Sequence, residues 1–200
     1  MPSKSEIQSV NRRNFLAVAV ATAVAGARID GQLPNAAAAV SSARVPLGLD
    51  GHSLRGMKWK ATQLINFAAE QRLDAVLLNN LNYFESLDES HLLKVKALAD
   101  KHDIRIYVGA GGICQNAAKF SDKFGNAEEM LATGIRVAAT LGSPVVNVRI
   151  GSIADRFLDG GIQPRIDEAV RVLKHSGKRA RDAGVTFGFE NHAADLRSEE

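Results

Sequence analysis

Five short apolar runs alternate along the chain with segments of helical spacing, and this alternation constrains the fold more than any other feature of the sequence. The runs, each a predicted strand, are residues 45–50, 75–80, 104–109, 145–150 and 185–190. Strands that alternate strictly with helices form a parallel sheet with right-handed crossovers. Two α/β architectures are compatible with this order: a doubly wound open sheet and a (β/α)8 barrel.

Helix start and stop signals support the segments between the strands. The pattern at residues 86–89 is typical of a capping box that opens a helix, and residues 126–129 carry a similar N-terminal signal. Pro164 stands where a first helical residue is expected, and Gly142 and Gly184 follow predicted helix ends. Each strand is therefore expected to lead into a helix that returns the chain to the next strand.

Successive side chains of a strand point to opposite faces of the sheet, and this parity distinguishes the two architectures. In the last run one face carries Val185, Phe187 and Phe189, and the other carries Thr186, Gly188 and Glu190. A doubly wound sheet is covered by helices on both faces and reads as apolar on both, whereas a barrel is covered only on its outer face. The pattern favours a (β/α)8 TIM barrel, with about five βα units over residues 40–200.

Composition narrows the class of function. The chain has 46% hydrophobic residues and a net charge of +3, and its single cysteine, Cys114, excludes a disulfide scaffold. Most of the positive excess lies in residues 1–39, so a nucleic-acid-binding surface is not expected.

Residues 1–39 are predicted to be an export signal and linker. Arg12 and Arg13 precede an apolar run, residues 15–26, which is too short to span a bilayer, where about 20 residues are needed. Small residues at 36–39 offer a cleavage region. The segment resembles a twin-arginine signal, which implies a periplasmic or extracellular protein without further membrane attachment. An amphipathic first helix with a basic cap is the alternative.

Polar side chains gather at the predicted C-terminal ends of the strands. Parity directs Asp50, Tyr107, Arg149, Glu190 and His192 towards the barrel lumen. A carboxylate there is costly unless it is paired, protonated or bound to a metal. Glu190 therefore has two interpretations: an ion pair with Arg149, or a ligand of a hard divalent cation such as Mg²⁺ or Mn²⁺.

The other candidates carry less specific signals. His192 is expected to act as a ligand or a proton carrier, with a hydrogen bond inside its loop as the alternative. Asp50, His52, Asn79, Tyr107, Arg149 and Asn191 are predicted to bind substrate, although a solvated loop explains the first two equally well. The glycine-rich segment at residues 109–112 either allows a ligand to approach the backbone or forms a tight turn.

Two segments carry a resemblance to a known family. Residues 48–52, and above all Gly-Val-Thr-Phe-Gly-Phe-Glu-Asn-His at 184–192, resemble the xylose-isomerase-like barrel superfamily of sugar phosphate isomerases and epimerases. The resemblance implies that Glu190 binds a divalent metal, Mg²⁺, Mn²⁺ or Zn²⁺. It also implies that the metal polarises a sugar carbonyl while a proton moves between neighbouring carbons.

The resemblance implies a metal-dependent isomerase or epimerase with a small carbohydrate substrate. A dehydratase or lyase on the same barrel, and a non-catalytic carbohydrate-binding barrel, are the alternatives. Family members with endonuclease activity use histidines after the second and third strands, where this chain has Asn79-Asn80 and glycines. The other metal ligands of the family come from strands six to eight. The chain is therefore expected to be C-terminally incomplete, with doubtful activity as it stands.

Overall fold

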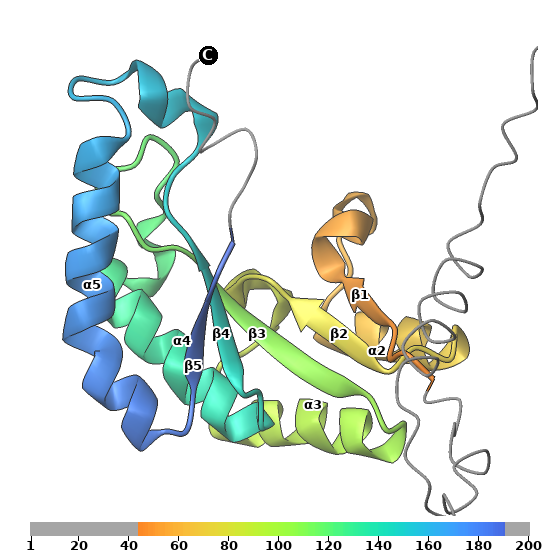
Figure 1. Ribbon diagram of the computed structural model, residues 1–200. Coiled ribbons are helices and arrows are strands. Elements are labelled where there is room, and N and C mark those ends of the chain that lie inside the picture. Colours follow the sequence, from red (N-terminus) through yellow and green to blue (C-terminus); the bar gives the residue numbers. More distant parts are fainter. Residues whose placement is uncertain (1–43, 191–200) are drawn as a thin grey trace, which may run out of the picture. The chain divides into compact units, whose positions relative to one another are not determined.

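The computed structural model describes residues 44–190, which form a five-stranded parallel sheet flanked by helices (Figure 1). The strands are β1 (Gly48–Asp50), β2 (Ala75–Leu78), β3 (Arg105–Gly112), β4 (Val145–Arg149) and β5 (Thr186–Phe189). They lie in the sheet in the order of the sequence, β1-β2-β3-β4-β5. The predicted signal, with Arg12 and Arg13, lies outside the described residues, and so do Asn191 and His192.

Four α-helices return the chain between the strands, and four short 3₁₀ helices lie in the loops. They are η2 (Gly51–Met57), α2 (Ala61–Glu70), η3 (Leu81–Tyr83), α3 (Glu89–Lys101), η4 (Asp122–Phe124), α4 (Ala127–Leu141), η5 (Ile153–Phe157) and α5 (Gln163–Asp182). A doubly wound sheet reverses its strand order at a switch point. Here the order runs on without reversal, as in consecutive units of a barrel. Among the described helices, none is long and apolar enough to cross a membrane.

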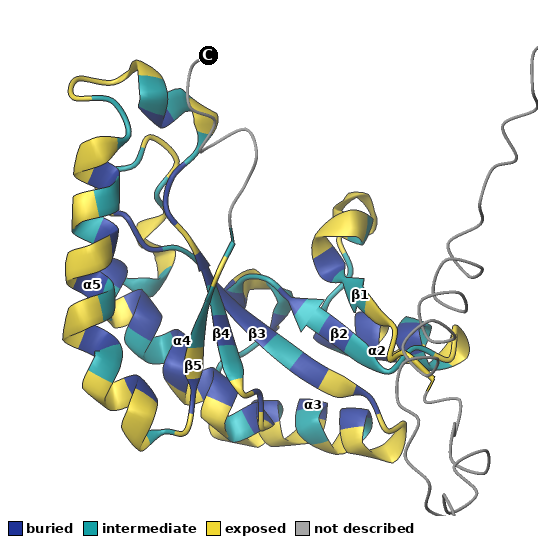
Figure 2. Ribbon diagram, in the orientation of Figure 1, coloured by how far each residue is buried: buried dark blue, intermediate teal, exposed yellow. Residues whose placement is uncertain are grey.

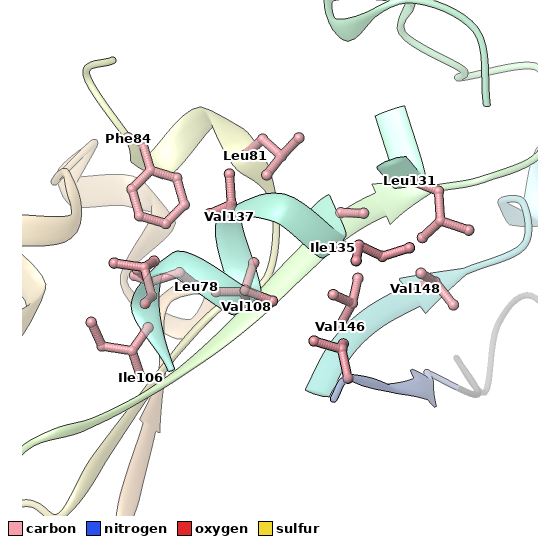
Figure 3. Packing of buried hydrophobic residues seen from close by; sticks show 14 of the residues in the cluster. Leu78, Leu81, Phe84, Ile106, Val108, Leu131, Ile135, Val137, Val146 and Val148 are labelled. Carbon is pink, nitrogen blue, oxygen red and sulfur yellow. The ribbon is translucent and has the colours of Figure 1, made fainter. Parts of the chain in front are cut away.

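The sheet buries one face, and this alternation confirms the parity argument. The buried strand residues are Val76, Leu78, Ile106, Val108, Val146 and Val148. Helix α4 packs on β3 and β4, and its Leu131, Ile135 and Val137 are also buried (Figure 3). On the opposite face Leu77, Tyr107 and Asn147 are only half-buried, and Figure 2 shows the strands changing between buried and more exposed residues along their length.

The helix caps agree with the sequence in one case and differ in another. The Asn126 side chain accepts hydrogen bonds from the amides of Glu128 and Glu129, and Gly142 ends the same helix with φ +72°. The capping box predicted at residues 86–89 is wrong. Helix α3 begins at Glu89 after Asp88, because the Ser86 hydroxyl bonds both the amide and the carboxylate of Asp88 instead of the helix.

The glycine-rich segment lies within a strand, so of its two interpretations the tight turn is wrong. Strand β3 continues to Gly112, and its register against β4 shifts between Gly109 and Gly111, which is a β-bulge. Helix α4 approaches the bulge so closely that a Cβ on Gly134 would lie 2.9 Å from the Cβ of Ala110. The bulge therefore curves β3 while keeping it packed under α4.

Candidate functional site

The C-terminal strand ends surround a hollow of about 150 Å³. Its lining comes from every strand or the loop that follows it: His52, Asn79, Asn80, Gly111, Asn147, Arg149 and Glu190. The structure thus brings together four of the residues predicted from the sequence, His52, Asn79, Arg149 and Glu190, although up to 138 positions separate them. Enzymes built on barrels place their active sites at this end of the strands.

Glu190 and Arg149 lie side by side without forming an ion pair. The Glu190 amide donates to the carbonyl of Val148 at 2.8 Å, which continues the register of β5 against β4. Glu190 is half-buried and Arg149 is exposed. Among the ion pairs of residues 44–190, none joins the Arg149 guanidinium to the Glu190 carboxylate. The ion pair that was one interpretation of Glu190 is therefore not formed, and the Glu190 carboxylate is available to another group.

Three carboxamides add neutral donors and acceptors to the hollow. The Asn80 side chain donates to Oδ1 of Asn79 at 3.0 Å and accepts from the amide of Asn82, which fixes it at the start of η3. Asn147 enters from β4, two residues before Arg149. Carboxamides both donate and accept hydrogen bonds, so this lining suits hydroxyl groups. The sequence marks Asn80 and Asn147 as polar residues at strand ends, but they were not among the predicted substrate-binding residues.

Gly109 brings the second and third strands together beside these amides. A Cβ on Gly109 would lie 2.3 Å from the carbonyl oxygen of Asn79. No real side chain tolerates that separation, so glycine is required here by close approach of backbone. This contact sets the position from which Asn79 and Asn80 enter the hollow.

Two predicted substrate-binding residues lie elsewhere. The Asp50 carboxylate accepts the amide of His52 at 2.9 Å and caps η2, so it is turned to its own loop. Tyr107 lies two residues before Gly109 in β3, farther from the C-terminal end of the strand. There its hydroxyl accepts a hydrogen bond from the Arg105 guanidinium at 3.4 Å. Both residues line a second, more open hollow of about 690 Å³, which extends to the N-terminal ends of β2 and β3.

A buried carboxylate that sequence reasoning missed ties the loops above β3 and β4 together. Asp155, fully buried in η5, accepts from the amides of Ser152 and Ala118, both at 2.7 Å, and faces Nε of Arg165 at 3.7 Å. Burial raises the pKa of Asp155, but these hydrogen bonds and the guanidinium outweigh it and hold the pKa below its ordinary value. The Ser152-x-x-Asp155 spacing was a visible capping signal.

A second carboxylate, Glu168 of α5, holds the same loop. It accepts from the amides of Gln115 and Asn116, both at 3.1 Å, and from the Cys114 thiol at 2.9 Å. Burial, followed by the hydrogen bond to Glu168, raises the pKa of Cys114 to about 12. Burial acts to raise the pKa of Glu168 as well, yet its hydrogen bonds lower it overall. No local pattern marked Glu168, because its partners lie more than 50 positions away.

Among residues 44–190, Glu190 is the one candidate carboxylate in this hollow for the metal that the resemblance implies. Glu190 fits, because it is a half-buried carboxylate without an ion-pair partner at the strand ends. Residues 44–190 contain no group of three or more His, Cys, Asp or Glu side chains placed to hold a metal ion. A complete coordination sphere would need ligands from outside the described part of the chain, such as His192.

Comparison with known proteins identifies the fold. No protein-family model matches the chain, and no curated protein sequence matches it. Among solved structures, a D-tagatose 3-epimerase-like protein superposes with a TM-score of 0.52 and 20% identity, over 74% of this chain and 53% of that one. A D-psicose 3-epimerase studied with D-fructose gives 0.54 and 14%, over 72% and 51%.

A xylose isomerase domain protein from Planctomyces limnophilus gives a TM-score of 0.50 and 15% identity, over 73% of this chain and 54% of that one. The chain thus spans about half the length of each of these structures. At these identities the likeness shows the fold alone, and it confirms the predicted α/β fold of the xylose-isomerase-like TIM barrel type.

Proposed function

We propose that this protein is an epimerase or isomerase acting on a sugar or a sugar derivative. The observation that carries the proposal is the convergence of Glu190, Arg149, His52 and three carboxamides in one hollow at the strand ends. Three solved structures that share the fold have names or titles that describe sugar epimerases or a xylose isomerase domain. The residues at the strand ends suit that chemistry.

Epimerisation and ketose–aldose conversion share one step, removal of a proton from the carbon beside a carbonyl. The neutral carboxamides would bind the hydroxyls that orient the sugar. Arg149 and His52 would donate hydrogen bonds to the oxygen on which negative charge develops, which lowers the barrier. Returning the proton to the other face gives the epimer, and returning it to the neighbouring carbon gives the isomer.

Glu190 is the one carboxylate of this hollow among the described residues. We propose it as the metal ligand and as the catalytic base that takes the proton from the carbon and returns it. A divalent cation, Mg²⁺, Mn²⁺ or Zn²⁺, would polarise the substrate carbonyl when bound. His192, outside the described residues, is proposed as its partner in ligation or proton transfer. We also propose export through the twin-arginine pathway to the periplasm or the medium.

The test is proton exchange in D₂O. The protein is incubated with D-fructose, D-psicose or D-tagatose, with Mn²⁺ or with EDTA, and NMR follows deuterium at the carbon beside the carbonyl. Exchange and a new epimer that appear with Mn²⁺ and are lost with EDTA would support the proposal. Glu190→Gln is expected to lower the exchange rate by about 100-fold or more. Glu70→Gln, at the exposed end of α2, is the matched control.

Each other outcome has a definite meaning. Exchange followed by loss of water would identify a dehydratase. Sugar binding without exchange, unchanged in Glu190→Gln, would identify a carbohydrate-binding barrel and contradict the proposal. Exchange at the same rate with and without EDTA would contradict the proposed role of a metal ion.

A further inference from the structure

Asn82 ties together three loops at the rim of the strand-end hollow. It lies in η3, where its carbonyl accepts from Nζ of Lys60 and its Oδ1 accepts from Nζ of Lys123, both at 2.7 Å. Lys60 precedes α2 in the connection that follows β1, and Lys123 lies in η4 after β3. The loop after β2 is thus held from both sides, although Asn82 itself is exposed and does not line the hollow.

This loop fixes which way round the two carboxamides after β2 lie. The backbone N–H of Asn82 can only donate, so the atom of Asn80 that it meets at 3.0 Å is Oδ1. The Nδ2 group of Asn80 is therefore the one that faces Asn79, and it donates to Oδ1 of Asn79 at 3.0 Å. An inverted carboxamide at either residue would set two donors or two acceptors against each other.

The consequence is a pair of carboxamides whose free groups are donors. Oδ1 of Asn79 and Oδ1 of Asn80 each accept from the protein, while among residues 44–190 no acceptor takes the N–H groups of Asn79. Both residues are half-buried and line the hollow. A carbonyl oxygen only accepts, so it matches this pair better than a hydroxyl, whose proton would compete for oxygens that are already bonded.

We infer that Asn79 donates to the carbonyl oxygen of the substrate, and that Asn80 and Asn82 are positioning residues that keep its amide group turned to the hollow. The inference rests on the proposed function and deepens it. Donors already in place stabilise the negative charge that develops on that oxygen as a proton leaves the neighbouring carbon. The alternative is an Asx turn in which Asn80 only caps η3, and it gives Asn79 no role.

Dihydroxyacetone and glycerol differ only in a carbonyl against a hydroxyl at the central carbon, so a comparison of their binding tests the inference. Each is titrated into ¹⁵N-labelled protein with EDTA present, and NMR follows the side-chain amide signals. We expect dihydroxyacetone to shift the Asn79 signals, assigned from Asn79→Ser, and to bind about threefold or more tightly than glycerol. The Asn126 amide, which caps α4 and does not line the hollow, is the internal control.

Asn80→Asp distinguishes positioning from capping. Its carboxylate still accepts from the Asn82 amide and caps η3, but it has no N–H group, so Asn79 turns to donate to it and presents Oδ1 to the hollow. We expect this variant to lose the preference for dihydroxyacetone. Asn82→Asp adds the same charge two positions later and keeps an acceptor for Lys123, so this matched control should retain the preference. Asn82→Leu removes that acceptor and should weaken it.

A preference that survives in Asn80→Asp, or equal binding of the two probes by the native protein, would overturn the inference. A shift of the Asn147 side-chain amide without one of Asn79 would overturn it as well. The proposed function fails separately, when no ketose exchanges deuterium, because the titration requires no proton transfer. Thermal unfolding of each variant confirms that the compared proteins are folded.

Discussion

A Cβ atom added to Gly109 would lie 2.3 Å from the carbonyl oxygen of Asn79, so β3 passes the end of β2 in backbone contact beside the candidate site. We expect Gly109→Ala to destabilise the protein by about 3 kcal/mol, because a strand must move to relieve the overlap. Urea unfolding followed by circular dichroism measures this. The control is Gly56→Ala, where an added Cβ meets nothing within 4 Å. Equal midpoints for the two variants would contradict the argument.

Among the carboxylates of the described fold, Asp155 is expected to contribute most to the free energy of unfolding. Asp155→Asn leaves Arg165 without its charge partner and replaces an acceptor of two backbone amides. Breaking such a buried pair costs about 3 kcal/mol. Asp100→Asn removes an exposed pair with Lys96 and should cost about 0.5 kcal/mol or less. Chemical unfolding of both variants at pH 7 gives the comparison.

The lowered pKa of Asp155 also predicts how stability depends on pH. Because the pKa is lower in the folded state, the stabilisation is present above the unfolded value of about 3.9 and is lost as pH falls through the folded pKa. The difference in unfolding free energy between the native protein and Asp155→Asn should therefore shrink below about pH 4. A difference that stays constant from pH 6 to pH 2 would show that the charge of Asp155 is not what stabilises the loops.

The order and type of the elements could be predicted because they depend on local patterns. Period-two runs gave the strands, and the buried Val146 and Val148 confirm the face assigned to them. Bounds were less predictable. The strand predicted from residue 45 begins at Gly48, and the glycines after residue 109 continue β3, because pairing with β4 decides where a strand ends.

The candidate site was predictable only where strand parity fixes the direction of a side chain. Parity correctly predicted that Arg149 and Glu190 lie on the same face of the sheet, and both line one hollow. Parity did not predict the position of the Asp50 carboxylate. Strand β1 has three residues and leads directly into η2, so this carboxylate accepts a hydrogen bond from the amide of His52. The clamps made by Asp155 and Glu168 depend on partners 37 and about 53 positions away, and no local pattern encodes such pairs.

Substitution of the arginine pair, Arg12 and Arg13, tests the proposed export; both residues lie outside the described part of the chain. Arg12→Lys combined with Arg13→Lys keeps the charge of the segment but removes the feature that the twin-arginine pathway reads. We expect the double variant to remain in the cytoplasm while the native sequence is recovered from the periplasm. Cell fractionation with an antibody against the protein measures this, and Lys4→Arg is the control. Unchanged periplasmic recovery of the double variant would argue for another role of this segment.

Cys114 is expected to be nearly inert in the folded protein. It is fully buried, and its pKa of about 12 leaves roughly one thiol in ten thousand ionised at pH 8, whereas the thiolate is the reactive form. A disulfide reagent at pH 8 should therefore react at least 100-fold more slowly with the native protein than in guanidinium chloride. Absorbance of the released thiol follows both reactions.

Glu168→Gln should raise the native rate, because it removes the anion that accepts the thiol proton and holds the amides of Gln115 and Asn116. Glu128→Gln is the matched control, since it breaks the pair with Arg171 on the surface of α4 and α5 and leaves this loop untouched. We expect about a tenfold increase for Glu168→Gln and none for Glu128→Gln. Measuring the rates well below the unfolding midpoint of each variant separates local loosening from global unfolding. A native rate that is the same in both variants would show that Glu168 does not hold the loop closed over Cys114.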